Sequence, residues 1–245
     1  MKSNRSFWLV FAAFLALASC FKRSIPIPHP PATDSVVTVN DTDQTLILRP
    51  DSTTGQDSYV SKLDDYPTDG NVNLNFAHEM VLARWVFSQD NYDSATQRGY
   101  IRFDSLRKIP STATVTSAIL YLYGESTSLS YPYGNSYYPG SYNPPNPGLI
   151  QRVVGGTWDQ KTITWNNAPA LTSVGQDTIP ASTSAFNYNV AVDVTSLVRT
   201  MVDSPATNYG FGLRLITEQA SRTMQFGSCE VPDSTLRPKL VVRYH

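Results

Sequence analysis

Side chains that commonly do chemistry in enzymes are scarce in this sequence. Its 245 residues include 20 Asp and Glu but only 3 histidines and 2 cysteines. A Ser-His-Asp triad and a histidine-rich transition-metal site both need histidine beside its partners, whereas His29, His78 and His245 lie far apart in the chain. Two cysteines cannot form a four-cysteine zinc site or a disulfide framework. These counts favour a binding protein over an enzyme, although the carboxylates leave a glycosidase pair open as an alternative.

The net charge limits the possible partners. With 19 basic and 20 acidic residues, the formal net charge is -1. A protein binds a phosphate backbone through a broad basic face, which so balanced a sequence does not provide. We therefore expect no nucleic-acid partner.

Oxygen-bearing side chains gather in one short stretch around Gly70. Ca²⁺ takes six to eight oxygen ligands, so such a stretch could hold this ion. The spacing does not match an EF-hand loop, because Pro67 stands where a ligand is expected. We interpret the stretch as a solvated turn, with a structural Ca²⁺ site as the alternative, and we expect no other cofactor. The metal candidates are Asp64, Asp65 and Asp69, which Asn71 and Asn73 follow.

A second gathering of side chains is aromatic. The segment 126–148 is too rich in proline for a pair of strands, and it is longer than most structural loops. Tyrosine offers a flat apolar face and a hydroxyl group, which suit a sugar ring. We therefore predict that the loop tyrosines bind carbohydrate, and the alternative is that they fold back over the edge of the domain. They are Tyr131, Tyr133, Tyr137, Tyr138 and Tyr142.

The remaining large or reactive side chains have simpler interpretations. Trp85, Trp158 and Trp165 lie in or beside apolar runs, so we expect all three in the core. Cys229 lies among predicted strand residues, and we interpret it as a small buried side chain rather than a nucleophile.

Cys20 ends a segment with the pattern of a bacterial secretion signal. Lys2 and Arg5 precede an apolar run, 7–17, of about 11 residues, which is too short to cross a bilayer. The ending LASC resembles a lipobox, in which the cysteine is acylated and becomes the mature N-terminus. We expect residues 1–19 to be a lipoprotein signal peptide and Cys20 to carry fatty acids such as palmitate. An ordinary signal peptide is the alternative.

Several acyl chains hold a protein stably at a membrane, so we expect a lipid-anchored protein. Phe21 rather than aspartate follows the cysteine, which resembles sorting to the cell outer membrane. Whether the protein faces the periplasm or the cell surface stays open. Residues 20–44 contain four prolines and no apolar period, so we expect an extended tether between the lipidated cysteine and a domain at 45–245.

The domain alternates short β-branched or aromatic runs with turn signals. One short helix is expected, 195–202, with Asp193 or Thr195 as its cap and Pro205 beyond its end. Many strands and almost no helix predict an all-β fold, an antiparallel β-sandwich of jelly-roll type. The predicted strands are 45–49, 81–87, 99–104, 115–123, 150–154, 162–165, 190–194, 210–217, 223–228 and 239–244.

Several of these runs form an ordered pattern across 45–244. The pieces are GQDSYV (55–60), GYIRFD (99–104), IP (109–110), SAILYL (117–122), ITWNNAP (163–169) after Trp158, DVTSLV (193–198), NYGFGL (208–213), SCE (228–230) and RPKL (237–240). Together and in this order they resemble the DNRLRE-domain proteins, which are grouped with carbohydrate-binding module family 96.

This resemblance implies a β-sandwich that binds polysaccharide without catalysing a reaction. The literal DNRLRE string is absent, and no ligand-contacting residue can be carried over. No catalytic domain is expected beside the module, so it would act as a binding protein alone. Two alternatives remain, a structural or adhesion module whose partner is another envelope protein and a glycan-active enzyme.

Overall fold

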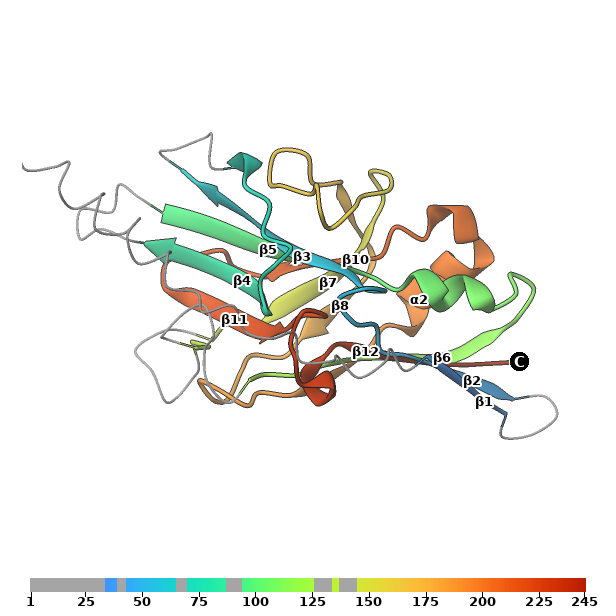
Figure 1. The fold of residues 1–245 in the computed structure, drawn as a ribbon. Helices are drawn as coiled ribbons and strands as arrows, with labels where there is room; N and C mark the ends of the chain where they lie inside the picture. Colours follow the sequence, from blue (N-terminus) through green and yellow to red (C-terminus); the bar gives the residue numbers. More distant parts are fainter. Residues whose placement is uncertain (1–33, 39–42, 65–69, 87–93, 126–133, 137–144) are drawn as a thin grey trace, which may run out of the picture. The chain divides into compact units, whose positions relative to one another are not determined.

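The computed structural model describes residues 34–38, 43–64, 70–86, 94–125, 134–136 and 145–245 (Figure 1). Contacts divide the chain into two compact units, Met1–Pro30 and Pro31–His245. The first unit lies outside the described residues, and every described strand belongs to the second. Cys20, Asp65, Asp69 and the five loop tyrosines of 126–148 also lie outside the described residues.

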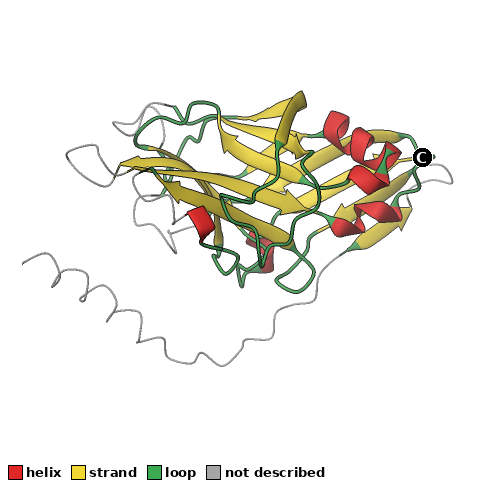
Figure 2. Ribbon diagram, turned by 90° about the horizontal axis from the view of Figure 1, so that it is seen from above, coloured by secondary structure: helices red, strands yellow, loops and turns green. Residues whose placement is uncertain are grey.

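The described strands form two antiparallel sheets, which confirms the predicted all-β sandwich (Figures 1 and 2). The five-stranded sheet has the order β1 (Ser35–Thr38), β2 (Gln44–Leu48), β12 (Lys239–Tyr244), β6 (Val115–Leu122) and β9 (Val190–Asp193). The seven-stranded sheet has the order β11 (Arg222–Gly227), β4 (Glu79–Val86), β5 (Ser94–Arg102), β10 (Phe211–Leu215), β7 (Gly148–Val153) and β8 (Leu171–Ile179), and β3 (Gln56–Leu63) pairs with β5.

The main core lies between the sheets because apolar residues alternate along the strands that face it. Leu120 of β6 and Leu240 of β12 are fully buried and pair directly, and Ile101 of β5 and Leu213 of β10 face them from the other sheet. All four belong to one continuous cluster of buried side chains. The two sheets therefore fix each other's position through their inner faces.

The predicted helix is α2 (Thr195–Asp203), which packs Leu197 and Met201 onto the same core. The N-cap residue is Val194, which makes no side-chain cap bond, so the prediction of Asp193 or Thr195 as the cap was wrong. The Asp193 carboxylate accepts hydrogen bonds from the Thr195 backbone N–H at 2.9 Å and from its hydroxyl at 2.6 Å, where the chain turns from β9 into the helix. The short 3₁₀ segments are η3 (Asp104–Lys108), η4 (Pro205–Thr207) and η5 (Ser234–Leu236).

Four elements differ from the prediction. Residues 162–165 form turns rather than a strand, so that prediction was wrong. Strands β3 and β8 were not predicted because their sequences, QDSYVSKL and LTSVGQDTI, are largely polar. Strand β1 lies within the stretch expected to be a tether and pairs with β2.

Strand β11 forms one edge of the seven-stranded sheet, and polar groups cover that edge. The Ser136 N–H donates to the Thr223 carbonyl at 3.0 Å, and the Gln225 N–H donates to the side-chain oxygen of Asn135 at 2.7 Å. The Asn146 side chain also donates to the Thr223 carbonyl. Short polar segments thus occupy the hydrogen-bonding positions that a further strand would take.

Candidate functional site

The outer face of the seven-stranded sheet carries a cavity of about 630 Å³. Its floor comes from four strands, with Val60 on β3, Arg98 and Tyr100 on β5, Gln151 on β7 and Arg214 on β10. One wall comes from the connection between β7 and β8, residues 154–170, which we call the cover segment. It contributes Trp165 and 168–170 to the lining.

The cover segment is held over the sheet by a second, smaller apolar cluster. Val60, Tyr100 and Val153 of the sheet pack against Trp158 and Ile163 of the segment. The ring of Tyr100 meets the ring of Trp158 edge to face, with centroids 5.8 Å apart. Trp158 is 7% exposed, so the predicted burial of this residue is confirmed.

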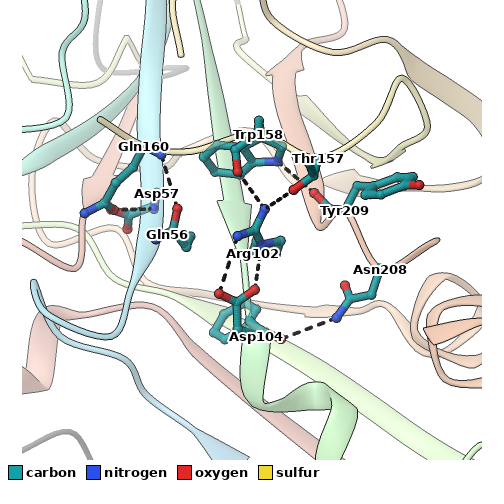
Figure 3. A network of polar contacts seen from close by, with 10 residues as sticks. Gln56, Asp57, Arg102, Asp104, Thr157, Trp158, Gln160, Asn208 and Tyr209 are labelled. Atoms are coloured by element: carbon teal, nitrogen blue, oxygen red, sulfur yellow. Dashed lines mark hydrogen bonds and ion pairs between the residues drawn. The ribbon is translucent and has the colours of Figure 1, made fainter. Parts of the chain in front are cut away.

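Arg102 anchors the start of the cover segment (Figure 3). Its guanidinium donates to the Trp158 carbonyl at 2.7 Å and to the Thr157 hydroxyl at 3.2 Å, while its Nε donates to the Asp104 carboxylate at 2.6 Å. It also lies 5.5 Å from the centroid of the Trp158 ring. The indole N–H of Trp158 donates to the Tyr209 carbonyl at 2.8 Å. We call this arrangement the Arg102 clamp, and in it both the cation and the indole have partners.

A glutamine pair extends the clamp to β3, as Figure 3 shows. The Asp57 backbone N–H donates to the Gln160 side-chain oxygen at 3.1 Å, and the Gln160 N–H donates to the Gln56 side-chain oxygen at 3.2 Å. The Asp57 carboxylate is 1% exposed and accepts the Cys229 backbone N–H at 2.7 Å. Burial raises the pKa of Asp57 to about 6, against the effect of the bonds from Cys229.

Asparagine side chains explain why 162–165 turns instead of forming a strand. Asn73 donates to the carbonyls of Gln160 and Ile163, both at 2.7 Å. The side chain of Asn167 accepts the Thr164 N–H at 2.7 Å. These bonds take backbone groups that a strand would offer to a neighbour, and they hold the turn that carries Trp165.

Trp165 is half-buried, so its predicted core position is confirmed only in part: it packs against the second apolar cluster and also lines the cavity. Its ring has Arg98 at 4.8 Å and Lys62 at 5.3 Å from the centroid. Arg98 is paired with both carboxylate oxygens of Glu218, at 2.7 and 2.9 Å. These bonds raise the pKa of Arg98 above its usual value, although burial opposes them.

Arg214 differs from Arg98 and Arg102 on this face, because both of those pair with a carboxylate. Its Nε donates to the side-chain oxygen of Gln151 at 3.0 Å, and one Nη donates to the Leu215 carbonyl at 3.2 Å. Among the described residues it has no carboxylate partner. Arg214 therefore presents a net positive charge to the cavity.

The other predicted site residues lie elsewhere. Asp64 pairs with Arg84 and Lys62 and accepts the Ser94 hydroxyl at 2.8 Å. The bond from Arg84 is the main reason why the pKa of Asp64 is lowered to about 2. Among the residues described, no group of three or more His, Cys, Asp and Glu could hold a metal ion. Trp85 is half-buried and packs against a small core cluster of Tyr59, Val81 and Ala83, so its predicted core position is confirmed in part.

Cys229 is fully buried, as predicted, and burial is the main reason why the pKa of its thiol is raised well above the usual value. Two carboxyl groups are also shifted. Burial and the nearby Glu79 raise the pKa of Glu125 to about 7, and burial and Asp57 raise the pKa of Glu230 to about 7. Neither group lines the cavity, whose described lining contains no Asp or Glu. The cavity thus lacks the paired carboxylates of a glycosidase.

Sequence reasoning missed the residues that build the cavity. The alternation of Arg98, Tyr100 and Arg102 on β5 was the available signal, because it puts three large polar or amphipathic side chains on one face. The pairing of β5 with β10 and of β10 with β7 brings Gln151 and Arg214 to them.

The model of carbohydrate-binding module family 96 matches residues 51–244, which include the Arg102 clamp and the whole cavity lining. The chain belongs to this carbohydrate-binding family. A search of curated proteins found no match. In the described part of this family 96 chain, no helix has the length and apolar character needed to cross a membrane.

Proposed function

We propose that the protein binds polysaccharide without catalysing its cleavage and that the cavity on the outer face of the seven-stranded sheet is the binding site. The observation that carries this proposal is the lining of the cavity, which includes Trp165 and Arg214 and, among the described residues, contains no Asp or Glu. Membership of a carbohydrate-binding family supports it.

The lining matches the two needs of a sugar ligand. The partly exposed indole of Trp165 supplies an apolar surface for the C–H face of a ring. The guanidinium of Arg214 supplies hydrogen-bond donors for hydroxyl oxygens. A volume of about 630 Å³ falls within the range of small-ligand sites, about 300–1,000 Å³. Because Arg214 lacks a carboxylate partner in the described chain, acidic polymers should bind more tightly than neutral ones at low salt.

A glycan array and affinity gel electrophoresis with the full chain test this function. A matched pair of polymers, polygalacturonate and its neutral methyl ester, isolates the effect of charge. The wild type should bind at least one array polymer, and Arg214→Gln should weaken that binding by about tenfold, the loss of one charged hydrogen bond. Arg243→Gln is the control, because Arg243 is exposed on the five-stranded sheet. No binding by the wild type, or equal effects of both variants, would overturn the proposal.

The same assay compares the cavity with the tyrosine-rich loop. The loop tyrosines lie outside the described residues, so their role in binding stays a prediction. A double variant, Tyr137→Ala with Tyr138→Ala, weakens binding if the loop holds the ligand and leaves it unchanged if the cavity does.

The proposal includes attachment to the bacterial cell envelope. The signal-like start and the lipobox-like ending at Cys20 support a lipid anchor in the outer membrane. Metabolic labelling with a palmitate analogue should mark the wild type and leave Cys20→Ser unmarked. Membrane fractions that retain Cys20→Ser as fully as the wild type would contradict the anchor.

A further inference from the structure

Strand β8 contains a large bulge at the rim of the cavity. Asp177 pairs with Ile150 and Thr172 pairs with Arg152, so the four residues 173–176 stand opposite the single residue Gln151. Gly175 has a φ of 71°, a left-handed conformation that glycine adopts without strain. The bulge thus places the side chain of Gln176 over Gln151 rather than in the regular ladder.

Two glutamines link this bulge to Arg214. The side-chain nitrogen of Gln151 donates to the side-chain oxygen of Gln176 at 2.7 Å. The side-chain oxygen of Gln151 accepts the Nε–H of Arg214 at 3.0 Å. Gln151 is 5% exposed, whereas Gln176 is exposed. Both ends of the buried amide are therefore used, one by the cation and one by the bulge.

The direction of these bonds follows from the chemistry of the guanidinium. Arg214 can only donate, so Gln151 must present its oxygen to it. Its nitrogen then points to position 176, where the side chain must accept. An amide that loses this acceptor is oriented by Arg214 alone, and its N–H groups lose their partner at position 176. The acceptor at position 176 thus supplies the second of the two bonds that fix the orientation of Gln151.

We propose that Gln176 is a positioning residue, whose side-chain oxygen holds Gln151 in the orientation that keeps Arg214 directed into the cavity. The geometric part of this inference stands on the described contacts, and its effect on binding rests on the proposed function. Position 176 then requires a strong hydrogen-bond acceptor, which Glu supplies, whereas the thioether of Met accepts only weakly.

The first test needs no ligand. In the full chain labelled with ¹⁵N-arginine, NMR reports solvent exchange of each arginine Nε–H, and Arg214→Lys assigns the signal of Arg214. We expect Gln176→Met to speed the exchange of this proton by about two- to tenfold, the protection of one hydrogen bond. Gln176→Glu should keep the wild-type rate. The Nε–H signals of Arg98 and Arg102, which bond to carboxylates, are internal controls and should not change.

The second test measures binding of polygalacturonate and of the tightest polymer in the array. Gln176→Met should weaken binding by about three- to tenfold. Its melting temperature should stay unchanged, because Gln176 is exposed. Gln176→Glu should show the wild-type exchange rate of the Arg214 Nε–H. Unchanged exchange of the Arg214 Nε–H in Gln176→Met would overturn the positioning role. Equally fast exchange in Gln176→Met and Gln176→Glu would also overturn it. Changed exchange in a chain that binds no polymer would keep the positioning role and overturn the proposed function.

Discussion

On the outer face of the seven-stranded sheet, an arginine and a tryptophan occur together in two places, the Arg102 clamp and the cavity, and their surroundings differ. At the Arg102 clamp, the guanidinium is paired with Asp104, lies against the Trp158 ring and holds the cover segment down. At the cavity, Arg214 has an amide partner in place of a carboxylate, and the nearby tryptophan, Trp165, is partly exposed.

The difference shows how this fold separates support from binding. A carboxylate neutralises a cation and leaves it little to offer a ligand, whereas an amide orients the cation and leaves its charge available. Arg98 belongs to the supporting type because Glu218 pairs with it. The clamp should therefore govern stability, and Arg214 with Trp165 should govern affinity.

The largest effect is expected at the clamp. Trp158→Ala removes a buried ring with contacts to Tyr100 and Arg102, and it should lower the free energy of unfolding by about 3–5 kcal/mol. Urea denaturation followed by circular dichroism measures this loss. A loss below about 1 kcal/mol would show that the clamp does not support the fold.

In contrast to Trp158→Ala, Trp165→Ala should reduce affinity strongly and stability only moderately. Because this ring is half-buried, its removal should cost about 1–2 kcal/mol of stability. Affinity for the bound polymer should fall by tenfold or more, because the apolar platform is lost. Affinity gels with folded protein give the second value. Retained affinity together with strong destabilisation would show that Trp165, like Trp158, supports the fold and does not bind the ligand.

The free energy of unfolding should depend on pH through Asp57, which lies beside the Arg102 clamp. The pKa of Asp57 is raised by burial to about 6, so its stabilising effect is complete below its unfolded value of 3.8 and is lost as the pH rises through 6. Asp57 alone should lower stability by about 1–1.5 kcal/mol between pH 5 and pH 8. Glu125 and Glu230 act in the same direction, with pKa values raised to about 7.

Denaturation curves at several pH values test this slope. Asp57→Asn should flatten it, because the uncharged side chain can still accept the Cys229 N–H. Asp64, with a pKa lowered to about 2, has finished titrating below this range and should not contribute. A wild-type stability that rises from pH 5 to pH 8 would contradict the assigned burial of Asp57.

The smallest effect concerns Glu218. Glu218→Gln removes a partly exposed ion pair and should cost less than about 1 kcal/mol of stability. It also leaves Arg98 without its carboxylate, so polygalacturonate should bind about twofold more tightly at low salt and equally at high salt. Asp104→Asn is the matched control at the clamp, where affinity should stay constant. Equal gains in both variants would mean that general surface charge drives the binding.

Strands with regular apolar alternation, such as 115–122 and 239–244, were predictable because their pattern shows directly which face is buried. The helix was predictable from Asp193 before it and Pro205 after it. Strand β8 was not, because its bulge leaves all of 173–176 exposed, the apolar Val174 included, so the burial pattern does not alternate.

The cavity was not predictable for a different reason. Alternation assigns Arg98 and Tyr100 to one face of β5, but it does not say that β10 and β7 are neighbours. Arg214 and Gln151 become partners only through that pairing, across 63 positions of sequence. Trp165 was assigned to the core because its apolar surroundings were visible and the asparagine-held turn that exposes it was not.

The covered edge of β11 has a consequence for the protein at high concentration. Crowding raises the chance that exposed sheet edges pair between molecules and build aggregates. Here Asn135 and Ser136 already occupy backbone groups of Thr223 and Gln225, so a neighbouring chain finds no free ladder to extend along this side. Copies packed closely together therefore cannot extend one another's seven-stranded sheet through β11 at these positions.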